Sequence, residues 1–361
     1  MRNFARLPGS DRAALFNEAA SRSGLPIAIV EKDFWVCWML DRMWASSFAS
    51  SLIFKGGTSL SKCFGLIERF SEDIDIGLDR KFLGFGGTAD PAAEGLSRKA
   101  RNKRVDCLKA AAKSWIETSF LDELTGSISS DLGEGSEAGW AWEMEADTDG
   151  VPKLRWKPPV SRSTRRGNQT DFPVSYLNRG VLIEIGSRAA HWPATIHQVA
   201  PYIAQHIPEA FSVPATAICT LDAARTFWEK ATILHVLYHE TELSLTGNRA
   251  PKERERFSRH CYDLHCLARS AHGEEMMKAH DLLADVVRFK STFFCSSNVK
   301  EDLYNDAVPG SFHLLPHAAL ESFLAADYAK MQSSGMFFGE APTWSQIHET
   351  LQETQKRINE E

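Results

Sequence analysis

The segment at residues 54–78, FKGGTSLSKCFGLIERFSEDIDIGL, constrains the fold of this chain more than any other. It turns at Gly56-Gly57 and ends with Asp73 and Asp75, which alternate with isoleucines. Because strand side chains alternate between faces, the two carboxylates would share one face of a strand while the isoleucines enter the core. The repulsion between two such carboxylates is relieved by a divalent cation. We therefore predict a strand at 52–55, a helix at 58–68 and an acid-bearing strand at 73–78.

The glycine pair predicts a phosphate cradle. Glycine has no β-carbon, so backbone amides and small hydroxyls can come close to phosphate oxygens. The predicted nucleotide-binding residues are Lys55, Gly56, Gly57, Thr58, Ser59, Lys62, Arg69 and Ser71. For Arg69 and Ser71, ordinary turn chemistry is an open alternative. A phosphate cradle followed by an acid pair is typical of a nucleotidyl-transfer site.

These residues resemble a known family. Gly57-Thr58 followed by Asp73-x-Asp75 resembles the Gly-Ser…Asp-x-Asp signature of the polymerase-β-type nucleotidyltransferase superfamily. The longer string FKGGTSLSK…RFSEDIDI resembles the AbiEii-type nucleotidyltransferase toxins, which include the MenT toxins of type IV toxin–antitoxin systems. The resemblance implies an α+β fold, with a polymerase-β-like core built on a mixed β-sheet and a mainly helical C-terminal region.

Three later positions resemble further motifs of the family. Glu184, in GVLIEIGS, resembles the third acid of the metal site; a structural ion pair is the alternative for a carboxylate among apolar neighbours. Lys230 resembles the lysine that meets the triphosphate, although a helical lysine is more often solvated. Asp263 resembles the aspartate of the family's last motif and would orient Lys230. The alternative is an ion pair on the helix surface with Arg259 or Lys230.

An apolar helix is expected over 27–44. Near its start it carries Glu31-Lys32-Asp33, which resembles the opening helix of the family. The alternative for these three residues is a solvated helix start whose charges suit the helix dipole.

The length of 361 residues is sufficient for two domains. We expect a nucleotidyltransferase core over 1–195, with N-terminal helices and an acidic, mobile insertion at 121–150. A helical domain over 196–361 would complete the nucleotide site. The chain has no apolar run of the ~18 residues that a membrane span needs, and its start lacks the apolar core of a signal peptide. Seven scattered cysteines argue against a disulfide framework, so we expect a cytoplasmic protein.

A net charge of −6 is unfavourable for a nucleic-acid partner, but local basic clusters matter more than the total. The first cluster lies on an amphipathic helix expected over 97–120, where a solvated face and contact with RNA or triphosphate are both open. The second, at 151–166, contains Trp156 and is expected at a sheet edge or in a loop because of Pro158-Pro159. An exposed Trp156 would be able to stack on single-stranded RNA.

Two patterns mimic zinc sites. His235 and His239 have i, i+4 spacing, but the HExxH pattern and a third ligand are missing. In HCYDLHC, Cys261 and Cys266 point in different directions on a helix, which predicts core packing.

The resemblance thus implies an Mg²⁺-dependent nucleotidyltransferase. Asp73, Asp75 and Glu184 would hold two Mg²⁺ ions, and a nucleoside triphosphate would be the substrate. The implied acceptor is RNA, such as the 3′ end of tRNA, and the implied partner is a cognate antitoxin protein in a toxin–antitoxin or phage-defence system. Two alternatives remain: nucleotidyl transfer to a small molecule, as in aminoglycoside nucleotidyltransferases, and a non-catalytic nucleotide-binding regulator.

Overall fold

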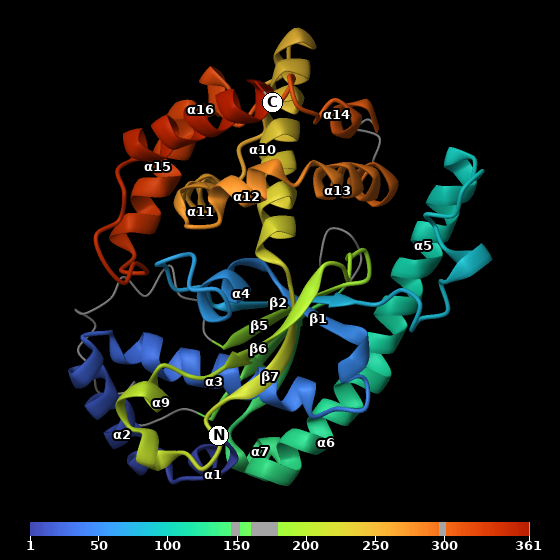
Figure 1. Ribbon diagram of the computed structural model, residues 1–361. Coiled ribbons are helices and arrows are strands. Elements are labelled where there is room, and N and C mark those ends of the chain that lie inside the picture. Colours follow the sequence, from blue (N-terminus) through green and yellow to red (C-terminus); the bar gives the residue numbers. More distant parts are fainter. Residues whose placement is uncertain (146–151, 160–179, 296–300, 361) are drawn as a thin grey trace. The chain divides into compact units, whose positions relative to one another are not determined.

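The computed structural model describes residues 1–145, 152–159, 180–295 and 301–360, which divide into two compact units (Figure 1). Unit 1 comprises Met1–Cys63, Phe70–Ala93 and Asn102–Leu221. Unit 2 comprises Phe64–Arg69, Glu94–Arg101 and Asp222–Glu361. The chain thus passes finally into unit 2 at Asp222.

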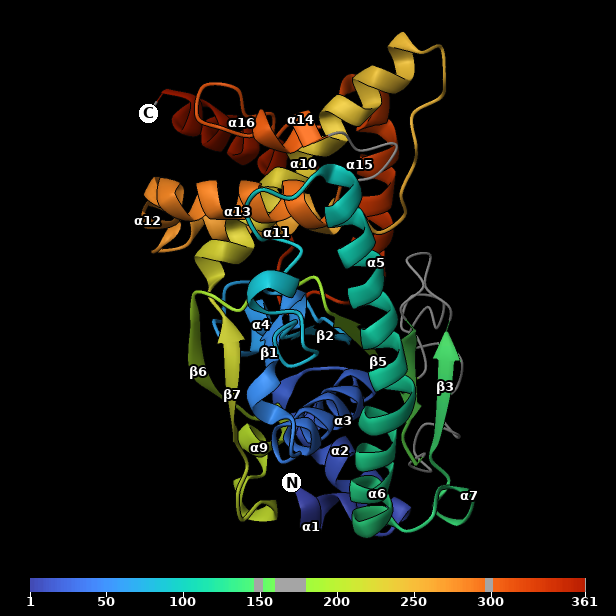
Figure 2. The same ribbon diagram turned by 90° about the vertical axis from the view of Figure 1, so that its right-hand side faces the viewer.

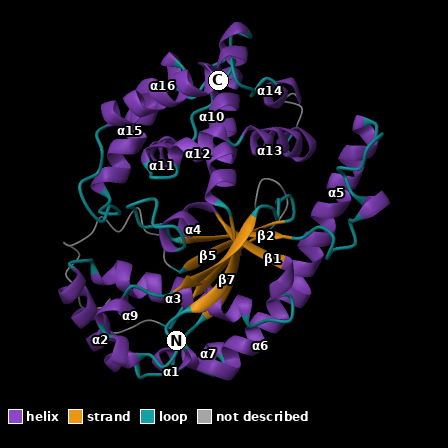
Figure 3. Ribbon diagram, viewed as in Figure 1, coloured by secondary structure: helices purple, strands orange, loops and turns teal. Residues whose placement is uncertain are grey.

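Unit 1 is built on a mixed seven-stranded sheet, drawn in orange in Figure 3. The strands are β1 (Leu52–Lys55), β2 (Asp73–Leu78), β3 (Ala141–Glu145), β4 (Lys153–Lys157), β5 (Val181–Gly186), β6 (Ala194–Val199) and β7 (Thr216–Leu221). Their order is β3-β4-β5-β2-β1-β7-β6, with β2/β5 and β1/β7 parallel and the other pairs antiparallel. This confirms the α+β class with a mixed sheet.

One face of the central strands is apolar and packs on α3 (Ile27–Trp44). Phe54, Ile76 and Ile185 lie in register on β1, β2 and β5, and all three are in the cluster that contains the aromatic residues of α3. Because strand side chains alternate, the residues between them, including Asp75 and Glu184, belong to the opposite face. The prediction of an apolar helix over 27–44 and of strands at 52–55 and 73–78 is confirmed.

The other helices of unit 1 cover the sheet and its ends. They are α1 (Arg2–Ala5), α2 (Gly9–Ser23), α4 (Gly56–Lys62), α6 (Leu121–Leu132), α7 (Gly135–Ala138) and α9 (Ile203–His206), while α5 (Arg98–Trp115) begins in unit 2 and ends in unit 1. The expectation of a mobile excursion at 121–150 is wrong for residues 121–145, which form α6, α7 and β3. Leu124 and Ile128 explain this, because both are fully buried and give α6 an apolar stripe. Residues 146–150 lie outside the described residues.

The second basic segment is also placed differently from the prediction. Residues 153–157 form β4, an interior strand paired with both β3 and β5, rather than an edge or loop. Pro158 and Pro159 follow the strand and so remove no ladder hydrogen bond from it. Trp156 is fully buried and stacks on Trp38 of α3 with ring centroids 5.2 Å apart, so it is not an exposed platform for RNA bases. Residues 151 and 160–166 of this segment lie outside the described residues.

The helix expected over 58–68 is shorter than predicted. It begins at Gly56, ends at Lys62, and is followed by Gly65 at φ +63°, a backbone conformation that favours glycine. Residues 64–69 then belong to unit 2, where the Glu68 amide donates to the Tyr262 hydroxyl at 3.1 Å. The helix ends because the chain leaves unit 1 at this point.

Unit 2 is helical and is arranged around the long helix α10 (Figure 1). Its helices are α10 (Ala223–Thr246), α11 (Ser258–Arg269), α12 (Gly273–Lys278), α13 (His280–Phe293), α14 (Glu301–Asn305), α15 (Ala318–Ser333) and α16 (Trp344–Glu360). The expectation that the chain is helical from about residue 195 is wrong at β6 and β7, which lie on either side of α9 and pair antiparallel over six residues each.

Two general expectations can be compared with the structure. All seven cysteines are free thiols, as the absence of a disulfide framework predicted. Across the part of the chain that the structure describes, no helix is both long and apolar enough to cross a membrane.

Candidate functional site

Three predicted acids meet on one face of the sheet in unit 1. Asp73 and Asp75 lie on β2, and Glu184 lies on the parallel neighbour β5, directly opposite Asp75 in register. All three residues are partly exposed, whereas Ile74 and Ile183 on the other face are fully buried. The pairing of β2 with β5 therefore brings together carboxylates more than one hundred positions apart in sequence.

Gly56 lies directly against this acid pair. It adopts φ +82°, and a β-carbon built on it would lie 2.0 Å from Oδ2 of Asp75 and 2.6 Å from its Cγ. A side chain at residue 56 would therefore be strained in its backbone and would displace the Asp75 carboxylate. The neighbouring Lys55 is partly exposed and pairs with Asp75 in the β1/β2 register.

We expect Gly56→Ala to reduce nucleotidyl transfer by at least ~10-fold, since small displacements of catalytic groups have large effects on rate. Gly24→Ala is the matched control: Gly24 has φ +71° but open space around its β-carbon position. The control isolates the backbone strain, about 1–2 kcal/mol, from the displacement of Asp75. Normal activity of Gly56→Ala in a triphosphate-transfer assay would contradict the role of this close approach.

Two hydroxyls of the predicted cradle donate hydrogen bonds to backbone carbonyls in this structure. Thr58 Oγ1 donates to the Asp73 carbonyl, and Ser59 Oγ donates to the Gly56 carbonyl at 2.9 Å. Both residues are buried; the Thr58 hydroxyl connects α4 to the start of β2, and the Ser59 hydroxyl bonds within the first turn of α4. Gly57 is also buried in the first turn of α4, and Ser71 is partly exposed just before β2. Backbone amides at the start of α4, rather than these hydroxyls, are the groups suited to an anion.

Lys62 is held in a buried ion pair. Its Nζ donates to Oδ1 of Asp33 at 2.7 Å and lies 3.5 Å from the centroid of the Tyr202 ring. The Tyr202 amide donates to the other oxygen of Asp33 at 2.6 Å. Burial alone would lower the pKa of Lys62, but the Asp33 carboxylate outweighs burial and raises it. The pair joins α4 to α3, which favours a structural role for Lys62 over contact with phosphate.

Replacing Lys62 with methionine should lower the free energy of unfolding by about 3–5 kcal/mol, because the Asp33 carboxylate would stay buried without its cation. The double variant Asp33→Asn/Lys62→Met should recover at least half of that loss, since asparagine can still accept from the Tyr202 amide. Urea denaturation measures both values. The exposed Lys81→Met is the control, with an expected change within about 0.5 kcal/mol. Similar losses in the single and double variants would show that the loss does not come from the unpaired carboxylate.

The Glu31-Lys32-Asp33 motif is buried rather than solvated. Glu31 and Asp33 are 8% and 1% exposed, so the interpretation as a solvated helix start is wrong. Lys32 donates to the carboxylate of Glu72, the residue immediately before Asp73. Burial lowers the pKa of Lys32, and Glu72 partly opposes that effect. Through Lys32 and Asp33, α3 thus holds both the start of β2 and the helix α4.

Glu184 forms an ion pair with Lys153. The Lys153 Nζ lies 2.7 Å from Oε1 of Glu184, and the two residues are also opposite each other in the β4/β5 register. Carboxylate oxygens are the ligands that Mg²⁺ prefers, and the register places Glu184 beside Asp75, so the donor types fit a divalent cation. Among the described residues, however, no group of three His, Cys, Asp or Glu side chains has the arrangement of a metal site. Glu184 would have to exchange Lys153 for the cation in order to join Asp73 and Asp75 in a metal site.

Lys230 and Asp263 form a second cluster, which lies in unit 2. Asp263 is fully buried and accepts from Nε and Nη2 of Arg69 at 2.8 and 2.9 Å, while Lys230 Nζ lies 2.8 Å away. Burial would raise the pKa of Asp263, but the two cations outweigh it and hold the pKa well below its usual range. Lys230 also lies 3.5 Å from Nδ1 of His260, whose pKa is lowered by burial and then by Lys230.

This cluster resolves two alternatives left open by the sequence. Lys230 is 7% exposed, so it is not a solvated lysine, and Asp263 is not part of a surface ion pair. Arg69 binds Asp263 through Nε and Nη2, so it does more than ordinary turn chemistry. The predicted contact of Lys230 and Arg69 with a triphosphate stays a prediction.

The two zinc-like patterns have structural roles. His235 is buried on α10, its Nδ1 accepts from the His313 amide at 3.2 Å, and burial lowers its pKa to about 3. His313 follows α14 in the chain and packs against His239 with ring centroids 5.0 Å apart. Cys261 is fully buried in the interior of unit 2.

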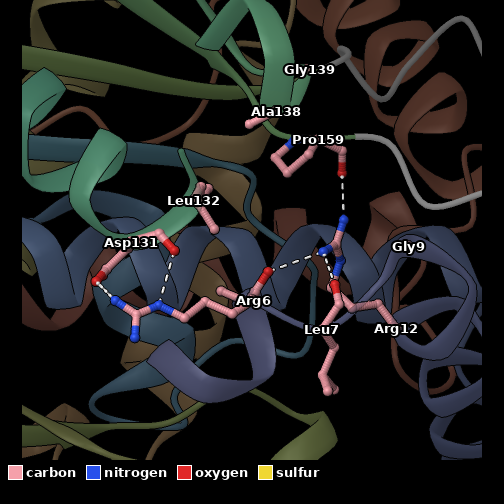
Figure 4. Close-up of a pocket in the computed structure, with 10 residues that line it drawn as sticks. Arg6, Leu7, Gly9, Arg12, Asp131, Leu132, Ala138, Gly139 and Pro159 are labelled. Atoms are coloured by element: carbon pink, nitrogen blue, oxygen red, sulfur yellow. Dashed lines mark hydrogen bonds and ion pairs between the residues drawn. The ribbon is translucent and has the colours of Figure 1, made fainter. Parts of the chain in front are cut away.

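A pocket elsewhere in unit 1 contains none of the predicted site residues (Figure 4). Its arginines bind the chain itself: Arg6 donates to Asp131, and Arg12 donates to the Ala5 and Leu7 carbonyls at 3.0 and 2.6 Å. These contacts connect the end of α1 to α6, and α2 to the end of α1.

Sequence reasoning missed Glu72 and Lys153. Glu72 directly precedes Asp73. An acid so close to two others needs a cation of its own, and this would have been a signal for a partner such as Lys32. Lys153 gave no signal, because only the pairing of β4 with β5 brings it to Glu184.

An α+β fold whose mixed sheet carries three acids on one face, beside a glycine turn that begins a short helix, is typical of the nucleotidyltransferase class. The family described as "Nucleotidyl transferase AbiEii toxin, Type IV TA system" matches residues 38–350. This chain belongs to the AbiEii family of nucleotidyltransferase toxins, and it is a nucleotidyltransferase.

Other comparisons add little to this assignment. No curated protein matches the chain. Among solved structures, MenT4, a nucleotidyltransferase toxin from Mycobacterium tuberculosis H37Rv, is similar to 96% of this chain over 98% of its own length, with 14% identity and a TM-score of 0.32. A likeness at that TM-score supports no inference about this chain.

Proposed function

We propose that this chain transfers a nucleoside monophosphate from a nucleoside triphosphate to a hydroxyl of RNA, with the 3′ end of tRNA as the acceptor and pyrophosphate as the leaving group. The observation that supports this proposal is the β2/β5 register, in which Asp75 and Glu184 are directly opposite on the face that also carries Asp73. Three acids on one face suit chemistry that must hold a polyanionic substrate through a hard cation.

Asp73, Asp75 and Glu184 would hold Mg²⁺, with Glu184 released from Lys153. When bound, Mg²⁺ neutralises phosphate charge and lowers the pKa of a coordinated hydroxyl. The chain's own groups do the rest: backbone amides at the start of α4 donate to phosphate oxygens, and Gly56 leaves room for the Asp75 carboxylate. Lys230 offsets triphosphate charge, and Asp263 fixes the direction of its amine.

We further propose that the enzyme acts in the cytoplasm as the toxin of a toxin–antitoxin or phage-defence system, restrained by a cognate antitoxin protein. The family assignment supports this biological role. Modification of tRNA at its 3′ end would block translation.

Incubation of the purified protein with Mg²⁺, total cell RNA and each of four labelled triphosphates tests the proposal. We expect label from one or more triphosphates in the tRNA fraction, and none when Mg²⁺ is chelated. Label found only on small hydroxylated compounds in a lysate would replace RNA with a small-molecule acceptor. Nucleotide binding without any transfer would instead favour a non-catalytic regulator.

A further inference from the structure

Helix α5 concentrates positive charge in a chain whose total charge is negative. The helix carries seven basic residues and one acidic residue, Asp106, whereas the whole chain has a net charge of −6. The basic residues are Arg98, Lys99, Arg101, Lys103, Arg104, Lys109 and Lys113. Figure 2 shows α5 as a long helix that continues toward α6.

The helical period separates a buried face of α5 from a charged one. Val105, Leu108 and Ala112 are buried and lie on one side of the helix. Lys99, Lys103 and Lys113 are exposed and lie on the side away from these residues, and we call these three lysines the α5 basic face. From Lys99 to Lys113 this face extends over about 21 Å, at 1.5 Å per residue.

The cations of this face lack the carboxylate partners that the other basic segment has. On β4, Lys153, Arg155 and Lys157 each form an ion pair, with Glu184, Glu145 and Glu143 respectively. Within the described residues, Lys99 and Lys103 form no ion pair, and Lys113 lies 3.9 Å from Glu117 at an exposed position. The charge of β4 is therefore neutralised internally, whereas that of the α5 basic face is open to an external anion.

The remaining exposed positions of α5 indicate the kind of partner. Apart from Arg98, they hold small, polar or acidic side chains: Asn102, Asp106, Cys107, Ala110 and Ser114. Protein interfaces depend on large aromatic or aliphatic anchors, which this face does not offer. Contacts to a nucleic-acid backbone need only cations and small polar groups, repeated along a line.

We propose that the α5 basic face binds the phosphate backbone of the acceptor RNA. This inference rests on the proposed function for its RNA acceptor, but it assigns a binding surface away from the acids that carry the chemistry. The face contributes affinity and salt dependence without sequence preference, because phosphates are the same at every nucleotide.

The test is the triple variant Lys99→Glu/Lys103→Glu/Lys113→Glu, compared with wild type for binding of fluorescein-labelled unfractionated tRNA. Fluorescence anisotropy without triphosphate, over a series of KCl concentrations, gives the Kd and its salt dependence. The control Lys252→Glu/Lys330→Glu/Lys356→Glu makes the same charge change at exposed lysines elsewhere. We expect the α5 variant to raise the Kd by at least ~30-fold and to reduce the salt slope by about 2, and the control to change the Kd by less than ~3-fold.

Three results would overturn the proposal: an unchanged Kd in the α5 variant, an equal loss in the control, or no tRNA binding by wild type. Unchanged thermal unfolding would show that the variant is folded, and K99Q/K103Q/K113Q should weaken binding in the same direction to a smaller extent. Labelled-triphosphate transfer on the same preparations separates the two proposals. If wild type labels RNA and the α5 variant binds tRNA normally, only the surface is wrong. If the α5 variant loses binding and wild type labels no RNA, the surface stands and RNA is not the acceptor.

Discussion

Asp75→Asn is expected to reduce nucleotidyl transfer by at least ~10³-fold, and Asp73→Ala should do the same, because each change removes charge stabilisation that matters most in the transition state. Both residues are partly exposed on β2, so their loss should leave the fold intact. Steady-state transfer from a labelled triphosphate measures the effect, and thermal unfolding monitors the fold.

The matched control is Asp79→Asn, since Asp79 lies beyond the end of β2 and its carboxylate accepts from the Lys81 amide at 2.9 Å. Activity of this variant should stay within ~3-fold of wild type, because the Asp79 carboxylate is used in a turn rather than in the acid pair. Near-normal activity in both acid variants would remove the proposed metal site from β2.

Asp263→Asn should lower the free energy of unfolding by about 3–5 kcal/mol, because it leaves Arg69 and Lys230 buried without their carboxylate. Asp263 is fully buried, so solvent cannot compensate for its loss. Urea denaturation followed by signals from unit 2 measures the change. Asp281→Asn, at an exposed position in the first turn of α13, is the control and should cost no more than about 1 kcal/mol.

The lowered pKa of Asp263 gives this contribution a defined pH dependence. The unfolded state takes up a proton near pH 3.9, whereas the folded carboxylate stays ionised to lower pH. The contribution of Asp263 is therefore fully present above about pH 5 and is lost as the pH falls through the folded pKa. The stability difference between wild type and Asp263→Asn should be constant near neutrality and shrink in acid; a difference that grows in acid would contradict the assigned direction.

Local patterns in the sequence predicted the strand, turn and strand around residues 52–78 because each depends on neighbouring residues. The alternation of acids and isoleucines places Asp73 and Asp75 on one face in any extended conformation. The same alternation placed Glu184 opposite the apolar face of its own strand. The expectation of helix at the positions of β6 and β7 was wrong because short strands are stabilised by their partners in the sheet rather than by their own residues.

The roles of the charged residues depended on partners distant in sequence. Lys62 has a side chain suited to a phosphate ligand, yet its amine donates to Asp33 and lies against the Tyr202 ring. Trp156 lies in a basic segment, yet the interior position of β4 buries it against Trp38. In each case burial and pairing, which only tertiary contacts create, decide whether a side chain remains available to a ligand.

The sequence by itself indicated the family and the acid pair, since the glycine turn and the two aspartates lie within one short segment, residues 54–78. Only the tertiary structure decided that Glu184 lies opposite Asp75 yet is paired with Lys153, and that Lys230 shares Asp263 with Arg69. The physical reason is that strand register and ion pairing are long-range choices, whereas the periodicity of side chains along one strand is local.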